Sequence, residues 1–112
     1  MGSFVIKKSE KGEHFFILKS DDLHILLTSQ VYSSKSDCLN GIEAVRHNCS
    51  DYTRYEHIKS DDNKYYFILK TSAGQLIGQS EKYETNAGLD NGIESVKKNG
   101  STTKVVEEEP YF

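Results

Sequence analysis

The apolar positions of this chain fall into short runs with strand-like spacing, and each set of three runs is followed by one longer run with helical spacing. This order occurs twice. The first half predicts strands at Phe4–Lys8, His14–Lys19 and Ile25–Ser29, and the second half predicts them at Tyr55–Lys59, Tyr65–Lys70 and Leu76–Ser80. In each following helix an apolar residue recurs at i, i+4 and i+7, namely Cys38, Ile42 and Val45, then Leu89, Ile93 and Val96.

An internal duplication explains the doubled pattern. Asn40–Asn48 returns as Asn91–Asn99, an offset of 91 − 40 = 51 residues that holds without a gap, and Phe-Ile-Leu-Lys occurs at both Phe16–Lys19 and Phe67–Lys70. The repeats run over about 3–51 and 54–107. A unit of ~50 residues buries too little surface to be stable alone. We therefore expect residues 1–112 to form one domain in which both repeats share a core.

The turns and helix ends carry local signals. Gly12 aligns with Asn63, and both residue types accept a positive φ at the end of a hairpin turn. At the next turn Gly74 aligns with Leu23, so the first repeat is expected to bend differently there. The helices are expected to begin after the N-caps Ser34 and Thr85 and to end with Asn48 and Asn99 in the left-handed position after the last turn.

The central strand of each repeat is apolar on both faces. Phe16 and Leu18 point to one face, and Phe15 and Ile17 point to the other. We expect a helix to cover the first face and the other repeat to cover part of the second.

Two repeated residues are unusual for a helix. Gly41 and Gly92 each cost ~1 kcal/mol of helix propensity relative to alanine, which is explained if the helix backbone packs closely against the sheet or the other helix. Asn40 and Asn91 are also poor helix formers. Their amides either tie down a neighbouring backbone group, the interpretation we favour, or bind a ligand.

The C-terminal segment Lys104–Glu107 aligns with Thr53–Glu56 at the same offset, so it is expected to be a third copy of the first strand that closes the second unit. The remaining residues 108–112 contain the only proline and are expected to form a loose tail.

Composition limits the class of protein. With 36% hydrophobic and 28% charged residues, the chain fits a soluble globular domain. Its net charge of −3 argues against bulk attraction to nucleic acid or to anionic membranes. The N-terminus lacks the pattern of a secretory signal, so a cytoplasmic location is expected. Cys38 and Cys49 lie eleven positions apart (49 − 38), or ~16 Å along one helix, which is too far for a disulfide.

The repeated order of Phe-Ile-Leu-Lys, Ser-x-x-Tyr and Asn-Gly-Ile-x-x-Val-(Arg/Lys)-x-Asn resembles the YegP-like family of small proteins of unknown function. The resemblance covers nearly the whole chain. It implies an α+β fold, built as a tandem duplication of a three-strand-plus-helix unit with antiparallel sheets, two helices and a pseudo-two-fold axis. It implies no activity. The residues that carry it are Phe16–Lys19, Ser29, Tyr32, Asn40–Asn48 and their counterparts Phe67–Lys70, Ser80, Tyr83 and Asn91–Asn99.

No catalytic or cofactor-binding pattern accompanies the repeats. The four histidines lack metal-type spacing, and only His14 and His24 are placed to approach each other across a hairpin. We find no glycine-rich phosphate loop and no nucleophile motif. The sequence therefore predicts no enzyme, no cofactor and no metal site.

Two functional classes remain. We favour a non-catalytic module that binds a protein or peptide and acts as a monomer, because the duplication supplies within one chain the contact that a single unit would find by dimerising. The alternative is nucleic-acid binding through basic residues and neighbouring tyrosines. The candidate binding residues are Tyr32, Tyr83, Asn40, Asn91, Lys19, Lys70, Arg46 and Lys97.

Overall fold

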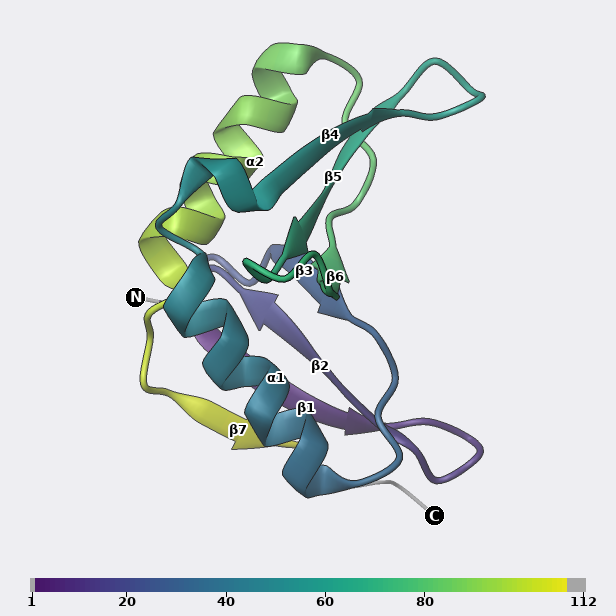
Figure 1. Ribbon diagram of the computed structural model, residues 1–112, viewed down its shortest axis with the longest axis vertical. Coiled ribbons are helices and arrows are strands. Elements are labelled where there is room, and N and C mark those ends of the chain that lie inside the picture. Colours follow the sequence, from purple (N-terminus) through teal and green to yellow (C-terminus); the bar gives the residue numbers. More distant parts are fainter. Residues whose placement is uncertain (1, 109–112) are drawn as a thin grey trace.

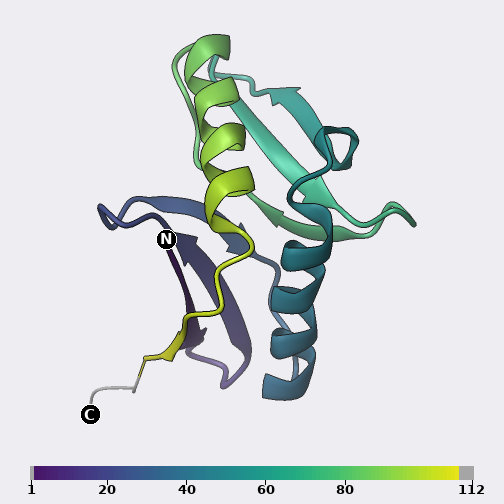
Figure 2. The ribbon, with the colours of Figure 1, turned by 90° about the vertical axis from the view of Figure 1, so that its left-hand side faces the viewer.

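The computed structural model describes residues 2–108 and shows two helices lying on one face of a twisted sheet (Figures 1 and 2). This arrangement is the α+β duplication that the sequence predicts. In chain order the elements are β1 (Ser3–Lys8), β2 (His14–Lys19), β3 (Ile25–Ser29), α1 (Lys35–Asn48), a short 3-10 helix η1 (Tyr52–Arg54), β4 (Tyr55–Lys59), β5 (Tyr65–Lys70), β6 (Leu76–Gln79), α2 (Asn86–Asn99) and β7 (Val105–Glu107).

All seven strands form one sheet in the order β4-β5-β6-β3-β2-β1-β7. The repeats meet where β3 pairs with β6 in antiparallel register, Thr28 opposite Gln79 and Ser29 opposite Gly78. Thr28 and Gln79 are counterparts, because 28 + 51 = 79. Two counterparts that pair with each other lie on either side of a two-fold axis. The pseudo-two-fold axis of the molecule therefore passes through this β3–β6 seam.

The two repeats share one hydrophobic core, as expected. Its cluster of buried residues includes Phe4, Phe16 and Leu18 of the first repeat together with Phe67 and Leu69 of the second. The apolar helix positions predicted from the i, i+4, i+7 pattern are buried in the same cluster. Neither half therefore encloses its apolar residues alone, which agrees with the small size of each unit.

The expectation that the second repeat covers the far face of β2 is wrong. Both helices lie on one face of the sheet (Figure 2), where their buried residues share the core with Phe16 and Leu18, whereas the second repeat continues the sheet sideways through the seam. Ile17, on the far face, is still only 3% exposed. Val5 and Thr28 stand opposite it on the neighbouring strands and shield it from both sides.

The helix starts are confirmed and the helix ends are corrected. The Ser34 hydroxyl accepts the Asp37 amide at 3.1 Å, and the Thr85 hydroxyl accepts the Gly88 amide at 3.0 Å. Asn48 and Asn99 do not adopt a left-handed conformation, because each is the last helical residue and the residue after it is also right-handed. Their side-chain amides instead donate to the carbonyl four residues back, at 2.7 and 2.8 Å, which adds a second hydrogen bond to a carbonyl of the last turn.

One turn expectation is confirmed and the other is wrong. Gly12 and Asn63 both have positive φ, of 79° and 61°. Leu23 also has a positive φ of 67°, close to the 84° of its counterpart Gly74, so the first repeat makes the same turn with an unsuitable residue. The surrounding hairpin imposes this conformation, since Leu23 donates its amide to the Ser20 carbonyl at 3.0 Å as Gly74 does to Thr71 at 2.9 Å.

The helix glycines allow another group to pack closely against the helix, as expected. That group is a tyrosine side chain rather than the backbone of the sheet or of the other helix. A Cβ atom on Gly41 would lie 2.3 Å from the Tyr32 hydroxyl oxygen, and one on Gly92 would lie 2.4 Å from that of Tyr83. The ring of each tyrosine thus rests on the helix of its own repeat. For Gly41 the ring of Phe16, at 3.0 Å, adds a second close contact.

The C-terminal segment pairs into the sheet, but not where the repeat pattern places it. β7 runs parallel to β1, with Phe4 opposite Val105, so it completes the first unit rather than the second. The amide of Glu108, the first residue of the expected tail, donates to the Ile6 carbonyl at 2.9 Å. The rest of that tail lies outside the described residues.

Both cysteines are buried and unpaired, in line with the sequence interpretation. Burial raises the pKa of Cys38 to about 11, so its thiol stays protonated at neutral pH.

Candidate functional site

Two surface grooves lie where the helix of one repeat faces the third strand of the other. The α1 groove has a volume of about 540 Å³ and is lined by Gln30, Tyr32, Asp37, Asn40, Gly41, Ala44, Thr71, Gln75, Leu76 and Ile77. The α2 groove has a volume of about 280 Å³ and is lined by His24, Ile25, Leu26, Glu81, Tyr83, Gly88, Asn91, Gly92 and Ser95. Every residue of the α2 groove is the counterpart, at the offset of 51, of a residue that lines the α1 groove.

The candidate pairs Tyr32 with Asn40 and Tyr83 with Asn91 are therefore each brought together in a groove. Both asparagines are exposed, and among the described residues no hydrogen bond engages either amide. The interpretation that these amides tie down a neighbouring backbone group is wrong. An exposed primary amide offers two donors and one acceptor group to a ligand, which matches the polar groups of a peptide bond.

The tyrosines are held rigidly from both sides. The backbone of Tyr32 exchanges two hydrogen bonds with His14, at 2.7 and 2.8 Å, and Tyr83 does the same with Tyr65, at 2.6 and 2.8 Å. Burial raises the pKa of Tyr32, with a smaller opposing effect from a hydrogen bond to Gln30, and burial also raises the pKa of Tyr83. Both phenols are therefore neutral at physiological pH and present a hydroxyl rather than a charge.

The repeated Ser-x-x-Tyr motif positions these rings. The Ser29 hydroxyl accepts the Phe16 amide at 2.9 Å and donates to the Gln30 carbonyl at 2.7 Å, and Ser80 makes the equivalent bonds to Phe67 and Glu81. In each repeat the serine hydroxyl thus accepts a strand amide in place of a backbone carbonyl. This happens where the chain leaves the third strand, and the residues that follow run toward the helix. The serines are structural rather than catalytic in this arrangement.

The four basic candidates do not gather in either groove. Lys70 pairs with Glu56 at 2.5 Å, and Lys97 pairs with Glu94 at 3.5 Å. Arg46 pairs with Glu43 at 2.6 Å and also donates to a backbone carbonyl. Half-buried Lys19 lies on β2 outside both grooves.

Arg46 has a structural role that sequence reasoning did not find. Its guanidinium lies 5.4 Å from the centre of the Phe4 ring, and its Nε donates to the Thr102 carbonyl at 2.9 Å. Arg46 therefore ties the last turn of α1 to β1 and to the segment that leads into β7. Such contacts join residues far apart in sequence, so no local pattern announces them.

A third hollow lies at the β3–β6 seam and shares lining residues with both grooves. It has a volume of about 440 Å³, and Gln30, Leu76, Ile25 and Glu81 border both this seam hollow and one of the grooves. Ile25 and Leu76 are each 41% exposed there. No lysine or arginine belongs to the described residues that line the three hollows. The whole surface is apolar and polar-neutral, with a slight acidic bias from Asp37 and Glu81.

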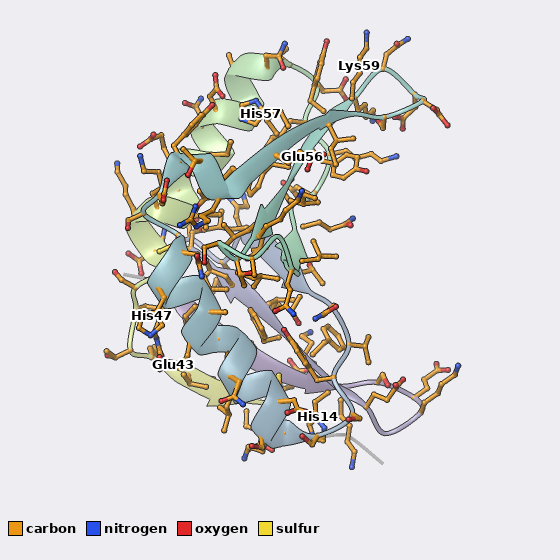
Figure 3. All side chains as sticks on the ribbon, viewed as in Figure 1. His14, Glu43, His47, Glu56, His57 and Lys59 are labelled. Atoms are coloured by element: carbon orange, nitrogen blue, oxygen red, sulfur yellow. The ribbon has the colours of Figure 1, made fainter. Side chains whose placement is uncertain are left out.

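The structure also separates the histidines. His14 pairs with Tyr32, whereas His24 precedes Ile25 at the other end of the β2–β3 ladder, so the two do not approach across the hairpin. Figure 3 shows His14, His47 and His57 in three separate parts of the molecule. In residues 2–108 no group of three or more His, Cys, Asp or Glu side chains is placed to hold a metal ion.

Several groove residues come from the opposite repeat and were missed from sequence. They include His24 and Gln75, which are counterparts of one another, and Thr71. A local pattern cannot reveal them, since they reach the helix only through the two-fold arrangement about the seam. Neither described helix is long and apolar enough to cross a membrane.

The fold and these grooves define a duplicated α+β protein with one related surface groove on each repeat. The profile of a domain of unknown function, DUF1508, matches residues 9–56 and again 60–107, which is the same offset of 51. The chain belongs to this family, whose members include the UPF0339 proteins and YegP.

Relatives that match over nearly their whole length confirm the assignment. The UPF0339 protein in the ptx operon 5′ region of Stutzerimonas stutzeri is 42% identical over 106 residues, covering 95% of this chain and 96% of its own. YegP of Escherichia coli K12 is 38% identical over 104 residues, covering 93% of this chain and 94% of its own.

Solved structures confirm the fold. The solution structure of the Shewanella oneidensis UPF0339 protein is 39% identical, with a TM-score of 0.89 over 95% of this chain and 90% of that chain. The solution structure of Escherichia coli YegP, described as a protein of unknown function, is 37% identical, with a TM-score of 0.91 over 96% and 92%.

Proposed function

We propose that this protein is a non-catalytic binding module that recognises a polypeptide segment through the α1 groove, the α2 groove and the seam hollow between them. The observation that carries the proposal is the pair of exposed, unengaged amides of Asn40 and Asn91, each beside a fixed tyrosine. Exposed apolar side chains at the seam, Ile25 and Leu76, supply contact area between these polar ends. The module is proposed to act as a monomer.

The charge of this surface favours a neutral or basic polypeptide. Phosphate contacts dominate the affinity of proteins for nucleic acids and require lysine or arginine. Neither residue type lines the three hollows, and three of the four basic candidates are engaged by carboxylates elsewhere. The nucleic-acid alternative therefore gains no support from the three hollows and stays a prediction.

The test is an amide-shift NMR titration of the ¹⁵N-labelled protein with a library of neutral and basic peptides and with single-stranded oligonucleotides. We expect peptide-induced shifts at residues of both grooves and the seam, and none with oligonucleotides. Shifts that occur only with oligonucleotides, or only away from the three hollows, would overturn the proposal.

A matched variant sharpens this test. Asn40→Ala and Asn91→Ala remove the amides, and Asn86→Ala removes an exposed asparagine of α2 that lines none of the hollows. We expect the first two to weaken peptide binding and Asn86→Ala to leave it unchanged. Because neither amide of Asn40 or Asn91 is bonded within the described chain, both variants should keep full stability or gain about 0.5 kcal/mol of helix propensity.

A further inference from the structure

The two outer edges of the sheet differ in one respect. β1 and β4 are counterparts, because 4 + 51 = 55, and in each repeat this strand lies outside the central strand. The outer side of β1 is occupied by β7, whereas β4 is the last strand of the sheet (Figure 1). The β1–β7 pair therefore shows, within the same molecule, how an added strand lies against this kind of edge.

The geometry of that pair is specific. β7 runs parallel to β1, with Phe4 opposite Val105 and Ile6 opposite Glu107. The Phe4 amide donates to the Lys104 carbonyl at 3.0 Å, and the Glu108 amide donates to the Ile6 carbonyl at 2.9 Å. The outward backbone groups of β1 are thus those of Phe4 and Ile6.

The corresponding groups of β4 belong to Tyr55 and His57. The chain itself satisfies the first of them, since the Tyr55 amide donates to the Tyr52 carbonyl of η1 in the role that Lys104 plays on β1. Backbone groups alternate along a strand, so the Tyr55 carbonyl and both the amide and carbonyl of His57 point outward. Glu56, His57 and Lys59 are exposed along this edge (Figure 3).

We propose that the outer edge of β4 binds an extended segment of a partner protein as an added strand, parallel to β4 and in the register that β7 takes on β1. Within the stretch that corresponds to the part of β1 covered by β7, three outward backbone groups remain, a number that suits a strand as short as β7 itself. This site is separate from the grooves, so the proposal stands or falls independently of the proposed function.

The side chains of the edge specify the chemistry of that segment. The position that Val106 takes beside Val5 would lie beside Glu56, a half-exposed carboxylate that already pairs with Lys70 at 2.5 Å. A carboxylate has acceptor sites for a second cation, so this position favours a lysine or arginine. The position of Glu108, which pairs with Lys7 at 3.5 Å, would lie beside the half-buried Ile58 and favours an apolar residue. The partner segment therefore carries a basic residue at the position of Val106 and an apolar residue two positions later.

The β7 of a second copy fits this edge poorly. Its Glu107 forms an ion pair with Lys35 at 2.5 Å, and Lys35 is replaced by Asn86 in the second repeat. Its Glu108 would lose Lys7 and meet Ile58 instead. Charged edge residues of this kind also discourage indiscriminate strand pairing between copies.

The test uses the full chain and the probe peptide Thr-Lys-Val-Lys-Gln-Val-Thr, with amide-shift NMR as the readout. The second lysine of the probe takes the place of Val106, and its last valine takes the place of Glu108. We expect a Kd in roughly the millimolar range, from a few backbone hydrogen bonds, and shifts centred on Tyr55–Lys59. The control peptide Thr-Lys-Val-Val-Glu-Glu, which is the sequence of residues 103–108, should bind more weakly.

N-methylated probes then test the register without altering the protein. In β7 the backbone groups of Lys104, Val106 and Glu108 face β1. N-methylation of the second lysine or the last valine of the probe should therefore abolish the β4 shifts, and N-methylation of the first valine or the glutamine should preserve them. Glu56→Gln should weaken the probe about two- to fivefold. The same variant should leave unchanged the Kd of a probe whose second lysine is replaced by methionine.

Four results would overturn the proposal. The first three are no β4 shifts at several times the expected Kd, equal effects of both kinds of N-methylation, and β4 shifts that depend on protein concentration without peptide. The third would assign the edge to a second copy. Loss of these shifts in Asn40→Ala or Asn91→Ala would also overturn it, because the grooves rather than the edge would then bind the probe.

Discussion

The two repeats differ most where they end. The edge strand β1 is covered by β7, and the Thr102 hydroxyl before β7 donates to the Gly2 carbonyl at 2.7 Å in a buried position. The counterpart strand β4 has η1 before it, and no strand lies beyond it in residues 2–108. In the middle of the chain the segment after the helix must itself become the next edge strand, so only the last copy is free to pair elsewhere.

The comparison shows that a duplicated sequence does not produce two equivalent surfaces. The same offset places Asn99 and Asn48 at the ends of the two helices, yet the Asn99 side chain accepts the Gly2 amide at 2.7 Å and Asn48 accepts the Nε of Arg54 at 3.1 Å. In each repeat, the asparagine at the end of the helix therefore binds a different neighbouring segment. The two repeats share the same strands and helix and differ in the segments that pack against their ends.

The largest expected effect compares the two helix glycines. Gly41→Leu should destabilise the protein by about 3 kcal/mol, because its side chain meets both Tyr32 and the buried ring of Phe16. Gly92→Leu should cost about 2 kcal/mol, since the three atoms nearest to an added Cβ all belong to the half-buried Tyr83. Urea unfolding measures both.

A third glycine is the control for that comparison. A Cβ on Gly88 would make ordinary contacts of 3.4 Å and longer, so Gly88→Ala should be neutral or stabilising by up to ~1 kcal/mol. If all three variants unfold at the wild-type midpoint, the close contact of tyrosine with helix does not limit these positions.

The next effect tests the covered edge. Ending the chain after Thr103 removes β7, and we expect a loss of about 2 kcal/mol from the ladder bonds and the two valines. The loss is smaller than full burial would give, because Val105 is 39% and Val106 is 41% exposed. Hydrogen exchange should accelerate at Phe4 and Ile6 and stay unchanged at His57.

The matched truncation ends the chain after Glu108 and keeps the β7 hydrogen bonds. It should change the free energy of unfolding by less than ~0.5 kcal/mol. Equal stability of the two truncated chains would show that β7 contributes nothing to the fold, and β1 and β4 would then be equivalent edges.

The smallest effect compares the β4–β5 hairpin with the β1–β2 hairpin. A hydrogen bond from Ser60, followed by the nearby Lys82, lowers the pKa of Asp62 to about 2 from an ordinary 3.8, and its counterpart in the first repeat is Lys11. A lowered folded-state pKa stabilises the protein above pH ~4, and this contribution is lost as the pH falls toward 2.

The test compares wild type with Asp62→Asn by urea unfolding across that pH window. The stability difference between them should shrink between pH ~4 and ~2. Ser60→Ala should move the pKa of Asp62, followed by carboxyl NMR, back toward its ordinary value. An unchanged pKa in Ser60→Ala would show that the hydroxyl does not hold the carboxylate.

The sequence by itself determined the secondary structure, the duplication and the buried helix positions, because these depend on local periodicity and on caps such as Ser34 and Thr85. It also singled out Tyr32, Tyr83, Asn40 and Asn91 among its candidate binding residues. It misjudged Leu23, whose positive φ is imposed by the hydrogen bonds of the hairpin rather than by its own preference.

Only the tertiary structure decided how the units are joined. Pairing of β3 with β6 makes one sheet with one open face, directs β7 to β1, and brings His24 and Gln75 to the helices of the opposite repeats. These contacts join residues far apart in the chain and depend on which strand edges remain unpaired once the core has formed. Strand periodicity specifies which face of a strand is buried, but it does not specify which neighbour lies beside it.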